Sequence, residues 1–119
     1  MTTPKTKTHH IDAAGKALGR VAAEAAKALM GKTHPDYTPN ILSDVKVTIE
    51  NAGKLTTREK KSVQTKFTHY TGFPGGLKIE SLQQLNKRKP GEALRRAIER
   101  MMPRNTFRNE RMKNLTITQ

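Results

Sequence analysis

The feature that most constrains the fold is an apolar stripe at helical spacing, followed further along the chain by a strand pattern. From about Ala17 to Met30, apolar side chains recur every three or four residues, which is the spacing of one face of an α-helix. Gly31 stands where a left-handed C-terminal cap belongs. After a loop with two prolines, residues 45–49 alternate with β-branched side chains, and this pattern predicts a strand.

The remaining segments continue this alternation of strands and helices. Shorter patterns predict an extended segment at residues 66–70 and strands at residues 9–12, 54–57 and 115–118. Helices are predicted from Ser81 to about Asn86, from Pro90 to the residues before Pro103, and over a short stretch from residue 105 or 106. Strands that alternate with helices are typical of a layered α/β fold with a mainly parallel sheet.

Length and composition predict one domain with a lean core. The chain has 119 residues, of which only 34% are hydrophobic, enough for a single modest core. We expect residues 1–8 to form a flexible basic extension and residues 9–119 to form a single α/β domain. The absence of cysteine excludes disulfides and thiolate sites. Because no apolar run approaches roughly 18 residues and the start lacks a signal-peptide segment, we expect a cytoplasmic protein without a membrane partner.

A large positive charge points to a polyanionic partner. Lys and Arg number 23 against 10 Asp and Glu, a net charge of +13. Such an excess opposes compaction unless a polyanion neutralises it, and a phosphate backbone is the commonest such partner. Residues 81–119 hold ten Lys and Arg against three Glu. These acids are too few for the alternating charges of a solvated helical face, so the sequence favours binding of nucleic acid.

A partial glycine motif raises a nucleotide-binding alternative, which its spacing disfavours. Three residues separate Gly15 from Gly19, whereas a phosphate-binding loop has four, and Arg20-Val21 follows in place of Lys and Ser or Thr. A strand-to-helix turn explains the glycines better. We therefore expect no small-molecule substrate and no cofactor, although stabilisation by ATP or GTP would favour a small nucleotide-dependent enzyme.

Histidines and carboxylates do not form a recognisable metal or catalytic set. His9 and His10 are adjacent, and neighbouring side chains of a strand point to opposite faces. His34 and His69 lack helical or turn spacing to any partner. The aspartates are scattered, and spacing alone cannot identify a Ser-His-Asp arrangement. We predict no metal site, no catalytic residue and no enzymatic activity.

The glycine-rich stretch at residues 71–77 leaves two interpretations open. Its three glycines allow backbone conformations that side chains forbid, and successive amides in such a loop can hold a phosphate oxygen. Alternatively, the stretch is an ordinary connection with demanding turn geometry. Lys66, His69, Tyr70 and Lys78 flank it and supply charge and stacking surface suited to RNA.

An ordered set of short motifs extends over nearly the whole chain. The motifs are Ile11-Asp12-Ala13, Gly15-Lys16, Leu18-Gly19-Arg20, Gly31-Lys32, Tyr37-Thr38-Pro39, Asn51-Ala52, Thr71-Gly72-Phe73-Pro74-Gly75-Gly76-Leu77, the run 97–103, and Leu115. In this order the chain resembles the large-subunit ribosomal protein family numbered thirteen, in its bacterial form.

The chain departs from that family at several positions. Tyr70 stands where the family usually has His, and Arg58-Glu59 replaces a Thr-Gly pair. Phe107-Arg108-Asn109 replaces Leu-Gly-Arg, and the usual tail beyond the last strand has no counterpart before Gln119. These departures concern individual RNA contacts rather than the assignment to the family.

The resemblance implies a three-layer α/β/α domain with a mainly parallel four-stranded sheet. It also implies a structural component of the large ribosomal subunit that binds and helps fold rRNA early in assembly, without catalysis. The implied partners are large-subunit rRNA and neighbouring large-subunit ribosomal proteins, in cytoplasmic ribosomes. The alternative is a free nucleic-acid-binding regulator outside the ribosome.

The predicted RNA-binding residues supply charge, stacking surface or close backbone approach. Phosphate contacts position a protein without reading sequence, so RNA shape is expected to give specificity. The predicted residues are Lys32, Lys60, Lys61, Lys66, His69, Tyr70, Gly72, Gly75, Gly76, Lys78, Lys87, Arg88, Arg95, Arg100, Arg104, Arg108 and Arg111.

Overall fold

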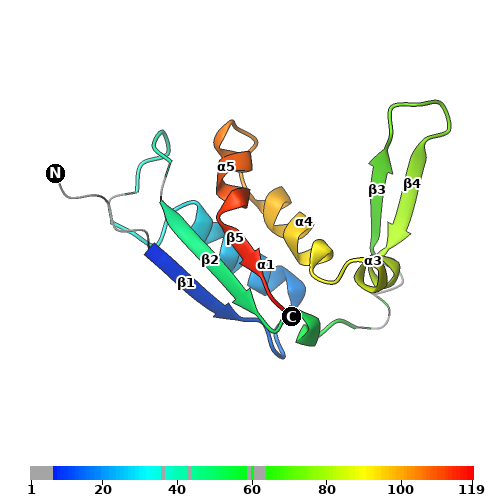
Figure 1. The fold of residues 1–119 in the computed structure, drawn as a ribbon, viewed down its shortest axis with the longest axis horizontal. Coiled ribbons are helices and arrows are strands. Elements are labelled where there is room, and N and C mark those ends of the chain that lie inside the picture. The colour runs from blue at the N-terminus through cyan, green and yellow to red at the C-terminus, as the bar shows by residue number, and fades with distance from the viewer. Residues whose placement is uncertain (1–6, 36, 43, 59, 61–63) are drawn as a thin grey trace.

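The structure is a computed structural model that describes residues 7–35, 37–42, 44–58, 60 and 64–119. Its helices and strands are shown in Figure 1. Along the chain they are β1 (Lys7–Asp12), α1 (Leu18–Leu29), β2 (Val45–Glu50), the 3₁₀ turn η1 (Ala52–Lys54), β3 (Lys66–Tyr70), β4 (Leu77–Ser81), α3 (Leu82–Arg88), α4 (Glu92–Met101), α5 (Phe107–Lys113) and β5 (Leu115–Ile117).

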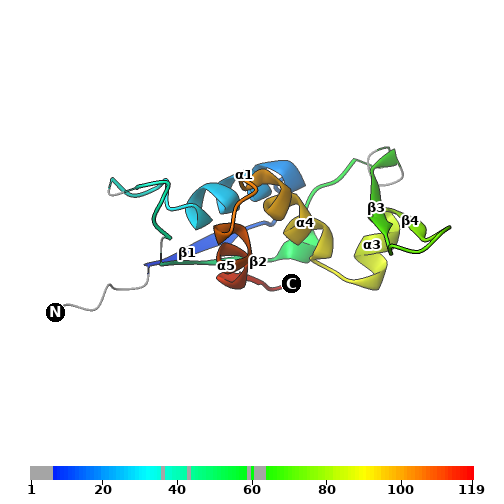
Figure 2. The ribbon, with the colours of Figure 1, turned by 90° about the horizontal axis from the view of Figure 1, so that it is seen from above.

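The body of the molecule is a parallel sheet with the strand order β1-β2-β5. In the central strand β2, Val45, Val47 and Ile49 are buried, whereas Lys46 and Glu50 are exposed. Helices α1 and α4 lie over one face of this sheet (Figure 2). Their apolar sides join the buried residues of β2 in the main core. The period-two pattern of β2 therefore marks which face the helices cover.

The sheet differs from the expected four-stranded, three-layer arrangement. Three parallel strands form it, and the described elements place their buried core on one face. The segment 54–57 does not form the expected strand, because η1 occupies its start and Thr56 makes only an isolated bridge to Ala17. The uncovered face of β2 carries Lys46 and Glu50, whose charges are better solvated than packed under a second helical layer. The broader prediction of a mixed α/β fold is confirmed.

Several local predictions are confirmed closely. The helix expected at about residues 17–30 spans Leu18–Leu29. Gly31 has a φ of 82°, and its amide donates to the carbonyl of Ala28 at 3.0 Å, as a left-handed cap requires. The expected boundary of the N-terminal extension stays a prediction for residues 1–6, which lie outside the described part of the chain. The prediction is wrong at Lys7 and Thr8, which belong to β1 because their backbone continues the parallel pairing with Val45 and Lys46 of β2.

An antiparallel hairpin, β3–β4, stands away from the parallel sheet (Figure 1). The segment 66–70 is extended as expected, but its partner is β4, a strand that the sequence patterns did not predict. Its buried residue Phe67 packs in a second small core with Leu82, Leu85 and Ala93. The molecule measures 53 × 37 × 18 Å, with a radius of gyration of 15.8 Å. A compact domain of this length would have roughly 13.5 Å, so the projecting hairpin gives the protein an elongated, flat shape.

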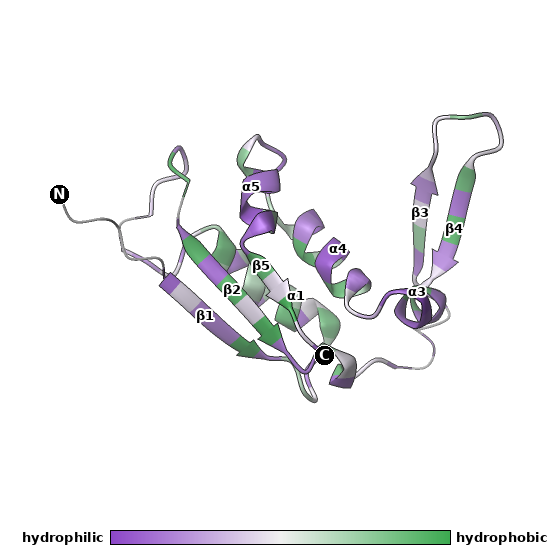
Figure 3. Ribbon diagram, in the orientation of Figure 1, coloured by the Kyte–Doolittle hydropathy of each residue, from purple (hydrophilic) through white to green (hydrophobic). Residues whose placement is uncertain are grey.

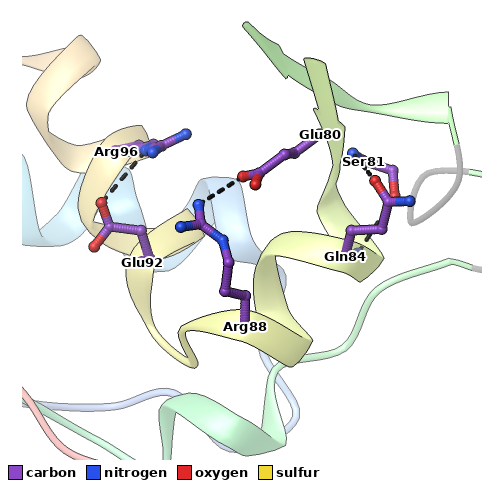
Figure 4. A network of polar contacts seen from close by, with 6 residues as sticks. All are labelled: Glu80, Ser81, Gln84, Arg88, Glu92 and Arg96. Carbon is purple, nitrogen blue, oxygen red and sulfur yellow. Dashed lines mark hydrogen bonds and ion pairs between the residues drawn. The ribbon is translucent and has the colours of Figure 1, made fainter. Parts of the chain in front are cut away.

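Ser81 joins the hairpin to α3 through a capping box. The hydroxyl of Ser81 accepts a bond from the amide of Gln84 at 3.3 Å, and the Gln84 side chain accepts one from the Ser81 amide at 3.2 Å (Figure 4). We expect Ser81→Ala to lower the free energy of unfolding by about 1 kcal/mol, because an N-terminal amide of α3 loses its acceptor. Chemical denaturation measures this difference. The exposed neighbour Gln83→Ala is the control and should change stability by less than about 0.5 kcal/mol.

Asp12 ties the ends of β1 and β2 together. Its carboxylate accepts from the Asn51 side chain at 2.9 Å and from the Ala14 amide at 3.0 Å. The pKa of Asp12 is lowered below its ordinary value of 3.8. The bond from Asn51 has the largest effect, the bond from Ala14 the next largest, and the charges of Lys16 and Lys54 add to them. A lowered carboxyl pKa contributes stability above the unfolded-state pKa, and this contribution is lost as the pH falls through the folded-state pKa.

We therefore expect the melting temperatures of the wild type and Asp12→Asn to converge in acid. Above about pH 5 the ionised carboxylate makes the wild type the more stable protein, because asparagine keeps the shape but not the charge. Below pH 3.8 the difference shrinks as Asp12 becomes protonated. Thermal melts of both proteins from pH 2.5 to 6 check this. A difference that stays constant over this range would contradict the assigned role of the carboxylate.

Candidate nucleic-acid interface

A basic cleft lies between the hairpin and the helices α4 and α5. Its volume is about 360 Å³. We use the term basic cleft for its lining residues, which are Thr68, His69, Arg96, Glu99, Arg100, Arg104 and Arg108. Four guanidinium groups thus face one carboxylate, so the cleft is suited to an anion.

The amphipathic pattern of α4 places the arginines on the cleft. Leu94 and Ile98 are buried in the main core, which fixes the rotation of the helix. Arg96 and Arg100 are four residues apart and therefore lie next to each other on one side of the helix. Helix α4 ends at Met101 ahead of Pro103, and the chain then turns so that Arg104 and Arg108 line the same cleft.

Phe67 orients two of these arginines. The ring is nearly buried, and the guanidinium carbons of Arg96 and Arg100 lie 5.9 and 5.4 Å from its centroid. Cations at this distance over an aromatic face are attracted by the ring quadrupole. This contact links the hairpin to α4 and holds both side chains at the border of the cleft.

The acidic residues next to the basic cleft neutralise only some of its arginines. Glu92 pairs with Arg96 at 3.4 Å (Figure 4), and Glu99 pairs with Arg108 at 3.3 Å. Within the described part of the chain, Arg100 and Arg104 have no carboxylate within 4.0 Å. These two guanidinium groups are thus free to bind an external anion, and a guanidinium matches the geometry of a phosphate.

A second cleft adjoins the first at the base of the hairpin. It is lined by Phe67, His69, Lys78, Glu80, Arg88 and Arg96. His69 lies opposite Lys78 in the hairpin register, and Arg88 pairs with Glu80 at 2.7 Å (Figure 4). Since His69 and Arg96 line both clefts, the two form one continuous polar surface.

The glycine-rich hairpin tip has the demanding turn geometry that the sequence allowed. Gly72 and Gly75 have φ values of 90° and 73°. A Cβ atom at Gly76 would collide with the Thr71 hydroxyl and press on the carbonyl of Phe73. The amide of Gly76 donates to the Phe73 carbonyl at 2.9 Å, and that of Thr71 donates to Gly76 at 3.2 Å. These two amides are therefore engaged inside the turn, and phosphate binding by the loop stays a prediction.

The structure brings together only some of the predicted RNA-binding residues. The two adjoining clefts unite His69, Lys78, Arg88, Arg100, Arg104 and Arg108. Those that are exposed but line neither cleft are Lys32, Lys60, Lys66, Tyr70, Gly72, Gly75, Lys87 and Arg95. Gly76 is half-buried in the hairpin turn, and Lys61 lies outside the described residues.

Arg111 occupies a different environment from the other predicted arginines. Its side chain is only 2% exposed, and its guanidinium carbon lies 5.6 Å from the centroid of the Phe107 ring. Sequence reasoning also missed Arg96, which lines both clefts. The four-residue spacing of Arg96 and Arg100 was the signal that could have identified it.

Membrane-spanning helices and metal sites are both absent from the described residues. None of their helices combines the length and apolar character that crossing a bilayer requires. In the same part of the chain, no three or more His, Asp or Glu side chains gather closely enough to hold a metal ion.

Comparison with known proteins relates nearly the whole chain to one family. The sequence profile of the family described as ribosomal protein L13 matches residues 6–118. A protein named large ribosomal subunit protein uL13 from Rubrobacter xylanophilus is 40% identical over 111 residues, which cover 93% of this chain and 78% of the relative. The protein of the same name from Dehalococcoides mccartyi is 45% identical over 103 residues, covering 87% of this chain and 72% of the relative. The one from Aquifex aeolicus is 39% identical over 107 residues, covering 90% and 74%.

Proposed function

The chain belongs to the ribosomal protein L13 family, and we propose that it binds large-subunit rRNA through the basic cleft and the adjoining hairpin. It is a structural component of the large ribosomal subunit and not an enzyme. The observation that carries the proposed site is the pair Arg100 and Arg104, which line the cleft without a carboxylate partner among the described residues.

Phosphate neutralisation explains how this surface binds RNA. Each bound phosphate releases condensed counterions, so closely spaced arginines gain affinity from the RNA backbone. Such contacts set position and orientation, while the shape of folded RNA supplies specificity. The flat, elongated molecule, 18 Å in its smallest extent, presents this surface along one side of α4 and the hairpin.

The domain boundaries and the assembly role belong to this proposal. Residues 7–119 act as a single rRNA-binding domain, because Lys7 and Thr8 belong to β1, and residues 1–6 act as a basic extension. The protein joins the large subunit early, contacts neighbouring large-subunit proteins, and resides in cytoplasmic ribosomes. Three predicted residues that line neither cleft, Lys60, Lys66 and Lys87, supply further positive charge for binding the RNA phosphate backbone.

Sedimentation of a cell lysate at physiological ionic strength tests the function. We expect the chain to co-sediment with the large subunit and with its assembly precursors, and to be displaced only by high salt. Ribonuclease treatment before sedimentation is the control, because it destroys the binding site. A chain found mainly outside ribosomal particles would favour a free nucleic-acid-binding regulator and contradict the proposal.

A further inference from the structure

The β3–β4 hairpin carries an exposed apolar face. Residues directly opposite each other in an antiparallel pair share one face, and the register pairs Tyr70 with Leu77 and Thr68 with Ile79. Tyr70, Leu77 and Ile79 are 60, 59 and 54% exposed, and Phe73 at the tip is 74% exposed. We use the term outer face for Tyr70, Leu77 and Ile79 on the strands together with Phe73 at the exposed tip. Figure 3 shows the apolar bands along β4.

The opposite face of the same hairpin has a different chemistry. It carries the His69–Lys78 pair and Glu80, which binds Arg88. These residues line the cleft that adjoins the basic cleft. Because strand side chains alternate between faces, Tyr70, Leu77 and Ile79 project from the side of the hairpin opposite to the His69–Lys78 pair.

The distal part of the hairpin lacks packing of its own. In β3 only Phe67, near the base, is buried, and β4 has no buried residue. A two-stranded hairpin is marginally stable in water unless another element covers one face. Clustered exposed apolar side chains on a soluble protein mark an interaction site. The outer face is therefore expected to be covered when the protein is in its particle.

The charge and shape of the side chains identify the kind of partner. The outer face has no charged group, and Lys66 at the hairpin base is the nearest cation in the same row. Tyr70 and Phe73 can stack on RNA bases, whereas Leu77 and Ile79 of β4 can neither stack on bases nor donate hydrogen bonds. A second copy of this chain would bring another net charge of +13 and be repelled. An uncharged, apolar protein surface complements this face best.

We propose that the outer face docks an apolar segment of another large-subunit protein, while the opposite face of the hairpin faces rRNA. This inference rests on the proposed function, since it requires the protein to be held in the ribosomal particle. The hairpin then joins RNA on one side to protein on the other, and RNA binding brings the outer face within reach of its partner.

Two double variants of the full chain separate the two faces. Leu77→Thr with Ile79→Thr removes apolar surface but keeps strand-forming residues, whereas Arg100→Gln with Arg104→Gln removes cleft charge. Each is measured for binding to protein-free large-subunit rRNA, and in competition with wild type for particles reconstituted with the other large-subunit proteins. We expect the outer-face variant to bind free rRNA like wild type but to lose about tenfold in the competition.

Every other result contradicts either the inference about the outer face or the proposed function of the basic cleft. An outer-face variant that binds free rRNA as weakly as the cleft variant would assign this face to RNA and overturn the inference. Undiminished competition would overturn it as well, and so would a wild-type dimer that the variant abolishes in sedimentation equilibrium. A cleft variant that binds free rRNA like wild type would instead contradict the proposed function.

A crosslinking experiment tests the same inference without changing either strand of the hairpin, so its result does not depend on whether the double variant folds. A photoreactive side chain placed at position 73 in the exposed turn leaves both strands unchanged. We expect it to crosslink to protein in reconstituted particles, and the same side chain at position 104 to crosslink to rRNA. Crosslinks from position 73 to RNA alone would overturn the inference.

Discussion

Replacing Arg100 and Arg104 together by glutamine is expected to weaken binding to large-subunit rRNA about thirtyfold near physiological salt. Both side chains line the basic cleft, and neither has a carboxylate partner among the described residues. Each phosphate contact contributes roughly 0.7 to 0.9 to the slope of log affinity against log salt. Losing two contacts should therefore reduce that slope by about 1.4 to 1.8. Filter binding across a salt series measures both quantities.

A charge-matched variant distinguishes the cleft from the overall positive charge. Lys27 and Lys46 are exposed on α1 and on the uncovered face of β2, and neither lines a cleft. Their double replacement by glutamine removes the same charge and should leave the salt slope nearly unchanged. If this control lowers the slope as much as the arginine variant does, binding depends on net charge and the basic cleft is not the interface.

Replacing Ile98 by alanine is expected to destabilise the protein by about 2 to 5 kcal/mol. Ile98 is fully buried in the main core, on the side of α4 opposite the solvent. Truncation loses apolar burial and leaves a cavity that the neighbouring side chains fill only in part. Because a domain of this kind has only about 5 to 15 kcal/mol of stability, the loss is a large share. Urea denaturation followed by circular dichroism measures it.

Arg95→Ala is the matched control on the same helix. Arg95 is exposed, so its removal should change the free energy of unfolding by less than about 0.5 kcal/mol. Ile98→Ala should also weaken rRNA binding when the temperature approaches its lowered melting point, because the core positions the arginines of α4. Equal stability of the two variants would show that α4 is not anchored as described.

Arg100 of the first prediction and Ile98 of the second lie on opposite sides of α4. Leu94 and Ile98 fix α4 against the sheet, and this fixes where Arg96 and Arg100 emerge. The ring of Phe67 then holds those two arginines against the hairpin. Stability and RNA binding are therefore connected through the rotation of α4.

Features that depend on neighbouring residues could be predicted from the sequence. The apolar period of α1, the alternation of β2 and the capping residue Ser81 each appear in the structure at the expected place. The net charge of +13 also indicated a polyanionic partner. These properties follow from backbone geometry and local chemistry, which a short stretch of sequence contains.

Pairing between distant segments was decided only by the tertiary structure. The strand at 66–70 pairs with β4 rather than with the parallel sheet, Arg96 lines both clefts, and Arg111 is buried beside Phe107. Alternation shows that a strand has two different faces, but it does not show which edge the strand will join. That choice, like the burial of one arginine among many, depends on the summed contacts of side chains far apart in the chain.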